Sequence, residues 1–296
     1  MKKIILSGFL SLIATTGLTS VAEATTCSIS GSIDFAYTGA IETCTVSQAG
    51  LYGVTAVGGG WQYIHYANAK GDVSLSSGEI ISIIVGSEPV NKVSVDGYGY
   101  TTGAGGSFVF QGSGSGATPL IVAGGSGGWG YGNAGATASV TTSGTAAGAG
   151  GGGGGVNGGN GVNSYGQGGE GYLAILAAPT PANGGVFGGG GNGYASGDGS
   201  GGGGGGYSGG GGGGYGVGDN GGGGGSFVVS TATNASIGII SGQTSYGGNG
   251  SVDFALINTT ASSPPSSVPE PGAIAVFASA IAGLVFARFW LKRRNT

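Results

Sequence analysis

The sequence predicts an all-β protein, an antiparallel sandwich or jelly roll that carries a glycine-rich insertion. Short segments rich in β-branched residues alternate with Gly/Ser turns, which is the pattern of half-buried strands. No stretch between the two ends of the chain has the 3.6-residue apolar period of an amphipathic helix. Strand-like segments lie on both sides of a glycine tract, residues 148–225, in which 42 of 78 residues are glycine.

The N-terminus has the three-part pattern of a secretory signal. Met1-Lys2-Lys3 precedes an apolar run at 4–18, and the small-residue site Ala22-Glu23-Ala24 follows. This pattern predicts that residues 1–24 are a signal peptide cleaved after Ala24. A buried N-terminal helix is the alternative.

Strands are expected in the order in which the apolar alternation appears. The candidate segments are 32–37, 42–46, 51–57, 73–75, 80–85, 107–111, 120–122, 226–230, 237–240 and 251–257. Segments 73–75 and 80–85 are predicted to form a hairpin across Ser76-Ser77-Gly78-Glu79. The apolar segment 172–178 within the glycine tract is either a short strand or a staple.

The glycine tract cannot be held by a hydrophobic core, because glycine has no side chain to bury and loses the most backbone freedom on folding. One possibility is a flexible Gly/Ser linker. The other is a set of extended helices with three residues per turn that pair N–H with C=O between neighbours. Tyr194, Tyr207, Tyr215 and Phe187 interrupt the glycine runs. Because aromatic residues at run ends can pin such a bundle, they favour ordered packing.

The position of the tract supports the same expectation. Segment 226–257 would lack strand partners if it folded alone. It is therefore expected to complete the sheets that begin before residue 123. We therefore predict one β-sandwich domain over 25–257, with a polyglycine-helix insertion over about 124–225.

Two cysteines remain after the signal, Cys27 and Cys44. An even pair in an exported chain favours a disulfide. Two free buried thiols, or a lipid on Cys27, are the alternatives.

The C-terminus has the features of an anchor. A polar linker at 258–267 leads to Pro269, Glu270 and Pro271, then to an apolar run at 272–287 and a cationic cluster ending in Lys292-Arg293-Arg294. The run is long enough to span a bilayer if Arg288 snorkels, and the cations should stay cytoplasmic.

These three parts, within 268–296, resemble the PEP-CTERM sorting signal of Gram-negative bacteria. The resemblance implies that an exosortase-like membrane protease recognises Pro269, Glu270 and Pro271 and removes the helix. It also implies a host that makes extracellular polysaccharide.

A second resemblance covers about residues 33–256. Its motifs, in order, are ETCTV at 42–46, GLY at 50–52, GEIISIIVG at 78–86, GGSFVF at 105–110, PLIVAGG at 119–125, the glycine runs at 201–214 and GGGGGSFV at 221–228. The series resembles the glycine-rich domain of the anaplastic lymphoma and leukocyte receptor tyrosine kinases. It implies a tumour-necrosis-factor-like sandwich bearing packed polyglycine helices, and no binding residues carry over.

Charge excludes one class of function. Between the end signals only Lys70 and Lys92 oppose ten Asp and Glu residues, which gives a net charge of −8. A nucleic-acid reader needs clustered Lys and Arg to neutralise phosphates, so no nucleic-acid partner is expected.

Little in the sequence suggests catalysis, a metal or a cofactor, and none is expected. His65 is the only histidine. A triad of His65 with Asp72 or Asp96 lacks a nucleophile-elbow serine, and the spacing of Asp198 and Asp219 does not fit calcium-binding repeats. Repeated Gly-x-Gly-x-x-Gly matches lack the helix that a dinucleotide loop needs.

Trp61, Tyr63 and Tyr66 form the one aromatic-rich loop candidate. They are either packed on the rim of the sandwich or arranged as a platform on which sugar rings stack. The sequence therefore predicts a non-enzymatic, exported structural protein of the cell surface or extracellular matrix. The alternative is a surface adhesin or carbohydrate-binding module, with extracellular polysaccharide as its partner.

Overall fold

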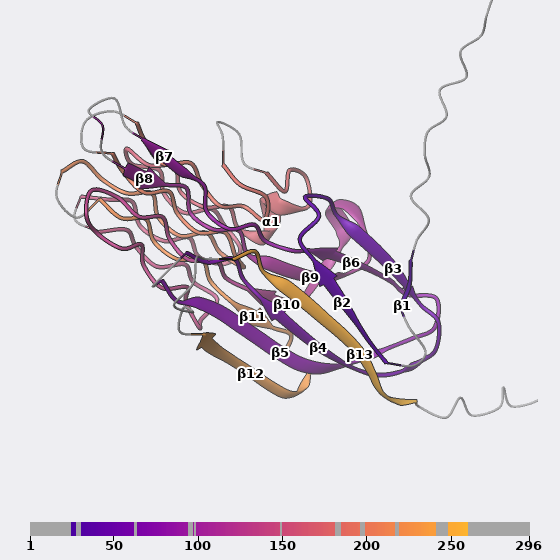
Figure 1. Ribbon diagram of the computed structural model, residues 1–296. Coiled ribbons are helices and arrows are strands. Elements are labelled where there is room, and N and C mark those ends of the chain that lie inside the picture. The colour runs from indigo at the N-terminus through magenta and orange to yellow at the C-terminus, as the bar shows by residue number, and fades with distance from the viewer. Residues whose placement is uncertain are drawn as a thin grey trace, which may run out of the picture.

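The computed structural model describes residues 25–27, 31–61, 64–93, 97, 99–148, 150–180, 185–195, 199–216, 219–240 and 248–259. These residues form the predicted all-β sandwich, with a large bundle of extended segments at one end (Figure 1). The described helices are the short α1 (Tyr172–Ile175) and a 3-10 turn (Gly114–Gly116).

Two sheets form the sandwich. The first has the order β1 (Thr25–Cys27), β3 (Glu42–Val46), β6 (Ile80–Ile84), β9 (Ser107–Gln111), β10 (Thr118–Ala123) and β11 (Phe227–Val228). The second has the order β12 (Thr233–Ile240), β5 (Tyr66–Leu75), β4 (Gly50–Val57), β13 (Ser251–Thr259) and β2 (Ser32–Ala36). All the pairs are antiparallel except β1 with β3.

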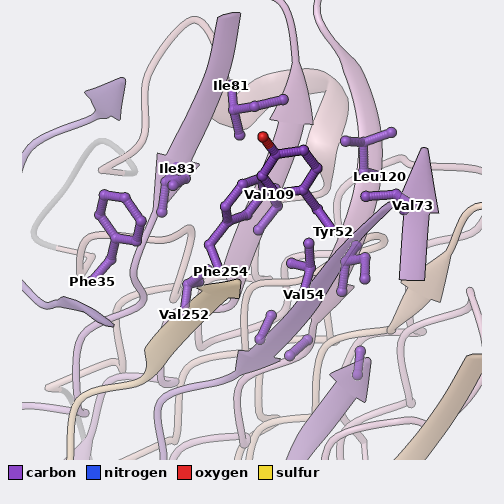
Figure 2. Packing of buried hydrophobic residues seen from close by; sticks show 14 of the residues in the cluster. Phe35, Tyr52, Val54, Val73, Ile81, Ile83, Val109, Leu120, Val252 and Phe254 are labelled. Atoms are coloured by element: carbon purple, nitrogen blue, oxygen red, sulfur yellow. The ribbon is translucent and has the colours of Figure 1, made fainter. Parts of the chain in front are cut away.

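The main core lies between these two sheets. Strand β4 alternates, so that Tyr52, Val54 and Ala56 are buried while the residues between them are partly exposed. The rings of Tyr52 and Phe254 are 5.1 Å apart, and Figure 2 shows them side by side in the cluster. The Tyr52 hydroxyl donates to the Gln48 carbonyl at 2.7 Å, which satisfies its one buried polar atom.

A second core covers the outer face of the first sheet. Phe108 and Phe110 point away from the sandwich and pack with Ile175 of α1 and with Phe187 from the glycine tract. Strands β6, β9 and β10 are therefore buried on both faces. This explains why their sequences are nearly continuous apolar runs instead of an alternation.

Cys27 and Cys44 form a disulfide that joins β1 to β3, and both residues are fully buried. This is the pair that the sequence predicts. No free cysteine is present among the described residues.

One predicted connection is wrong: β5 and β6 do not form a hairpin. Strand β5 pairs with β4 and β12, whereas β6 pairs with β3 and β9. The turn at 76–79 instead bonds to β3, where Gly78 donates to the Val46 carbonyl and Val46 donates to the Glu79 carbonyl, both at 2.8 Å. The chain changes sheets here because β5 and β6 face the same core from opposite sides.

Other differences are smaller. Strands β5 and β12 begin earlier than expected, and β13 extends to Thr259, into the segment predicted as linker. The hairpin of β7 (Asn91–Val93) and β8 (Gly99–Thr101) is not anticipated by the strand pattern. The undecided segment 172–178 contains a helix, α1, and not a strand.

The described parts of the glycine tract form regular extended segments, and the strands continue directly into them. We use the term glycine bundle for the extended segments 58–60, 85–90, 101–106, 124–129, 136–148, 150–170, 188–193, 201–216, 219–226 and 248–250. The bundle thus begins before the predicted insertion at about 124, since β4 and β6 lead into it and β9 emerges from it.

Hydrogen bonds in the bundle follow a three-residue period. In segment 201–207, every third amide donates to the same neighbour: 201, 204 and 207 to the carbonyls of 219, 222 and 225; 202 and 205 to those of 101 and 104; 203 and 206 to those of 167 and 170. These donors therefore point in three directions, as expected for a helix with three residues per turn.

The carbonyls of the same segment point in three further directions. Those of 201 and 204 accept from 213 and 210, those of 202 and 205 from 128 and 125, and that of 203 from 191. Segment 201–206 is thus surrounded by six chain segments, three of them parallel and three antiparallel. Residues 209–214 bond with the same period, for example 209 to 159 and 212 to 162.

Such packing requires glycine because the chains lie too close for side chains. A Cβ on Gly203 would overlap the carbonyl oxygen of Gly210, and one on Gly210 would overlap the carbonyl oxygen of Gly222. No residue in 201–214 has a positive φ, which agrees with the φ of about −75° of polyproline II.

Aromatic residues close one end of the bundle. Tyr207 lies between Tyr172 and Phe227, with ring centroids 4.7 and 4.6 Å away. All three pack against the second core. Tyr207 thus pins the bundle to the sandwich, as its position between two glycine runs predicts.

No helix in the described part of the chain is long and apolar enough to cross a membrane. The predicted signal peptide and the predicted span within 268–296 lie outside the described residues.

Candidate functional site

Trp61 lines a pocket of about 250 Å³ together with Asn91, Thr101 and Trp129. Trp61 follows the glycines that extend β4, and Trp129 follows those that extend β10. The two indoles are 68 positions apart in the chain, and the bundle brings them to one site. Trp129 and Asn91 are functional candidates that the sequence analysis missed.

The β7–β8 hairpin builds the floor of this pocket. Asn91 and Thr101 are register partners in the hairpin. The Thr101 amide donates to the Trp129 carbonyl at 2.8 Å, and the Trp129 amide donates to the Thr101 hydroxyl at 2.7 Å. The Trp129 ring packs over Gly99, where a Cβ would lie 3.0 Å from the ring. These contacts fix the Trp129 side chain before any ligand arrives.

The other two aromatic candidates have different positions. Tyr63 lies outside the described residues. Tyr66 begins β5, opposite Ile240 of β12, and its ring covers Gly60. Tyr66 does not line the pocket, so the loop candidate of Trp61, Tyr63 and Tyr66 is replaced here by the pair Trp61 and Trp129.

The lining of this pocket contains no ionisable side chain. It offers two indole rings and the Asn91 side-chain amide, while the buried Thr101 hydroxyl accepts from the Trp129 amide. Aromatic faces with a few fixed polar groups suit a neutral, partly apolar ligand such as a sugar ring.

The described residues among those considered for catalysis and metals do not form a common site. The Asp72 carboxylate accepts from the Asn234 amide at 2.6 Å, and the His65 carbonyl accepts from the Ala138 amide at 3.1 Å. Asp219 is buried in the bundle, while Asp96 and Asp198 lie outside the described residues. Within the described part, no three His, Cys, Asp or Glu side chains could hold a metal ion.

Two carboxyl groups have perturbed ionisation. Burial in the bundle raises the pKa of Glu170, whose Oε2 has no hydrogen-bond partner among the described residues. On the outer face of the second sheet, Asp253 lies opposite Asp34. Three causes raise the pKa of Asp253. The largest is the hydrogen bond between the two carboxyl groups, and burial and repulsion by the Asp34 charge add to it.

The predicted signal cleavage at Ala24 and the sorting motif Pro269, Glu270 and Pro271 lie outside the described residues. The chain matches no protein-family model, and no curated protein matches it.

Proposed function

We propose that this is an exported structural protein of the cell surface or extracellular matrix, in which the sandwich holds the glycine bundle as a rigid platform. The observation that carries the proposal is the three-residue hydrogen-bond period of segment 201–206, which is bonded to six neighbouring segments. A bundle tied by its own backbone in six directions resists local opening and exposes few groups for chemistry.

The composition fits that role. The body has two cations and ten carboxylates, so its solubility rests on a modest negative charge and on polar backbone. The disulfide between Cys27 and Cys44 suits an oxidising compartment outside the cytoplasm. Both properties support export without identifying a partner.

In this proposal the two terminal signals direct the export and processing of the chain. The signal peptide at 1–24 directs export, and the C-terminal helix holds the chain in the membrane until an exosortase-like protease cuts near Pro269, Glu270 and Pro271. The processed protein then stays at the surface or in the matrix of a Gram-negative bacterium.

Processing can be tested by changing the motif in the native host. The Pro269→Ala/Glu270→Ala variant should accumulate as an uncleaved, membrane-retained chain, whereas the Ser266→Ala/Ser267→Ala control in the linker should mature normally. Cell fractionation and the apparent mass on blots give the readout. Unchanged processing of the motif variant would contradict the sorting proposal.

Carbohydrate binding is the second candidate function, and the Trp61–Trp129 pocket favours it. On a glycan array, Trp61→Ala and Trp129→Ala should each lose binding that the native chain shows. Matrix localisation without binding to any glycan favours the purely structural function.

A further inference from the structure

Three exposed tyrosines gather at the end of the glycine bundle opposite to Tyr207. Tyr165 is 51% exposed, Tyr194 41% and Tyr215 64%. The ring of Tyr165 lies 5.7 Å from that of Tyr194 at 65°, and 5.3 Å from that of Tyr215 at 43°. We call these three residues the tyrosine cluster.

The bundle itself holds the three rings together. Tyr165 precedes Gly166, whose amide donates to the Gly213 carbonyl at 2.8 Å, and Gly213 donates to Gly201 at 2.9 Å. Tyr215 follows the run that contains Gly213, and Tyr194 bridges to Ser200 just before Gly201. The cluster is therefore built on three neighbouring segments of the bundle that are joined by backbone hydrogen bonds.

Exposure distinguishes this cluster from the aromatic group at the other end. Tyr207, Tyr172 and Phe227 pack against a core and so stabilise the bundle. The three rings of the tyrosine cluster contact one another and leave much of their surface in water. An exposed aromatic patch on a rigid element marks a binding surface.

A pocket beside the rings supplies oriented polar groups. It has a volume of about 220 Å³ and is lined by Tyr165 and Tyr194 with Asn163, Gln167 and Asn192. The Asn163 side-chain oxygen accepts from Gly168 at 2.8 Å, and that of Gln167 accepts from the Asn192 amide at 3.2 Å. These bonds fix both amides by their oxygens, and the NH₂ groups of Asn163 and Gln167 donate to no other described residue.

The chemistry of this pocket selects the ligand. Its lining has no carboxylate and no cation, and the neighbouring Lys92 ammonium donates to the Asn192 side-chain oxygen. The body as a whole is negative, which disfavours polyanions. Its volume is below the roughly 300–1,000 Å³ of sites for drug-sized molecules. A single neutral sugar ring, with its C–H face on a tyrosine and its hydroxyls on the amides, matches the rings, the donors and the size.

We propose that the tyrosine cluster with Asn163 and Gln167 is a binding site for neutral polysaccharide, distinct from the Trp61–Trp129 pocket. One sugar ring enters the pocket between Tyr165 and Tyr194, and the adjoining part of the chain lies over Tyr215. The β7 strand separates the two sites, since Asn91 lines the tryptophan pocket while Lys92 donates to Asn192 at 2.6 Å. Figure 1 places β7 at the end of the molecule away from β1 and β3.

The proposal can be tested by affinity electrophoresis of the purified full-length chain. The gels contain hydroxyethyl cellulose, laminarin or dextran. The native chain should be retarded by at least one of these neutral polymers, with retardation unchanged in high salt. Tyr165→Ala should weaken binding about tenfold, because it removes one of the two rings that line the pocket.

Two further variants guard against misfolding. Tyr215→Ala removes the most exposed ring of the cluster and should weaken binding without changing the melting temperature. Gln167→Leu removes the side-chain amide together with the acceptor of the Asn192 amide, so it should weaken binding and lower the melting temperature slightly. Tyr37→Ala, an exposed tyrosine after β2, is the matched control and should bind like the native chain.

The outcomes are distinct for the two sites. Loss of binding in the tyrosine variants, with binding kept in the Tyr37→Ala control, supports the site proposed here. Loss only in the tryptophan variants, or no retardation by any of the three polymers, overturns it.

Discussion

Gly203 and Gly210 lie so close that a Cβ on Gly203 would overlap the carbonyl oxygen of Gly210. The two residues belong to antiparallel neighbours, joined by the bond from the Gly210 amide to the Gly204 carbonyl at 2.8 Å. The absence of a side chain, which excludes glycine from a hydrophobic core, is what allows these backbones to pack.

Substitution of Gly203 tests this packing. Gly203→Ala should lower the free energy of unfolding by about 1–3 kcal/mol or more, because the added methyl group meets rigid backbone. Gly153→Ala is the matched control within the same tract, since nothing lies within 4 Å of a Cβ there and the residue is exposed. Chemical denaturation should show this control unchanged within about 0.5 kcal/mol. Equal effects of the two changes would contradict the close-packed bundle.

Hydrogen exchange should distinguish a bundle from a linker directly. Amides of 201–214 should exchange roughly a thousandfold more slowly than in an unfolded chain, because exchange requires opening of bonded segments. Mass spectrometry of peptides across 184–225 provides the measurement. Uniformly fast exchange there would restore the linker interpretation.

Removal of the disulfide should destabilise the sandwich. Cys27→Ser/Cys44→Ser opens a link across a sequence separation of 17, which predicts a loss of about 2–4 kcal/mol. Denaturation with and without reductant measures the effect. The native chain should respond to reductant and the double variant should not; thiol labelling of the unreduced native chain would argue against the disulfide.

Stability should fall with rising pH because of Glu170. Burial raises the pKa of this carboxyl above its ordinary 4.5 in the folded state, so the folded state binds the proton more tightly than the unfolded chain. The resulting stability is complete below about pH 4.5 and is lost as pH rises through the folded pKa. Glu170→Gln should therefore be more stable than the native chain at neutral pH and lack this pH dependence.

The control for this prediction is Glu88→Gln, which removes the same charge at an exposed position. Unfolding curves from pH 4 to pH 8 should show the native slope in this control. A Glu170→Gln variant that is less stable at neutral pH would show that the ionised carboxylate contributes favourably.

Local patterns predicted many strands closely. Strands β3 and β9 have the expected bounds, and the turn residues around them carry enough signal to define their ends. The pairing of β5 and β6 was not predictable in the same way, because a short polar connection serves equally for a hairpin or for a crossing between sheets. The choice depends on β3 and β9, which contact β6 from distant parts of the chain.

The candidate sites, like the strands, were predicted from the sequence only in part. Trp61 stands out in the sequence, but its partner Trp129 has only a glycine-rich context. The roles of Tyr207 and Tyr215 differ although both follow six-glycine runs: one ring is stacked against a core and the other is exposed. A tyrosine that follows a glycine run marks the end of an extended segment. Its place in the sequence does not indicate at which end of the bundle it lies.

The sequence alone determined that this chain forms β structure, that Cys27 and Cys44 are the available disulfide pair, and that the glycine tract has nothing to bury. These properties depend on residue type and on neighbours close along the chain. Only the tertiary structure decided the sheet partners, the six neighbours of segment 201–206 and the two aromatic pockets. Each of those depends on contacts between residues far apart in sequence, and glycine backbones carry no side-chain pattern from which such contacts can be read.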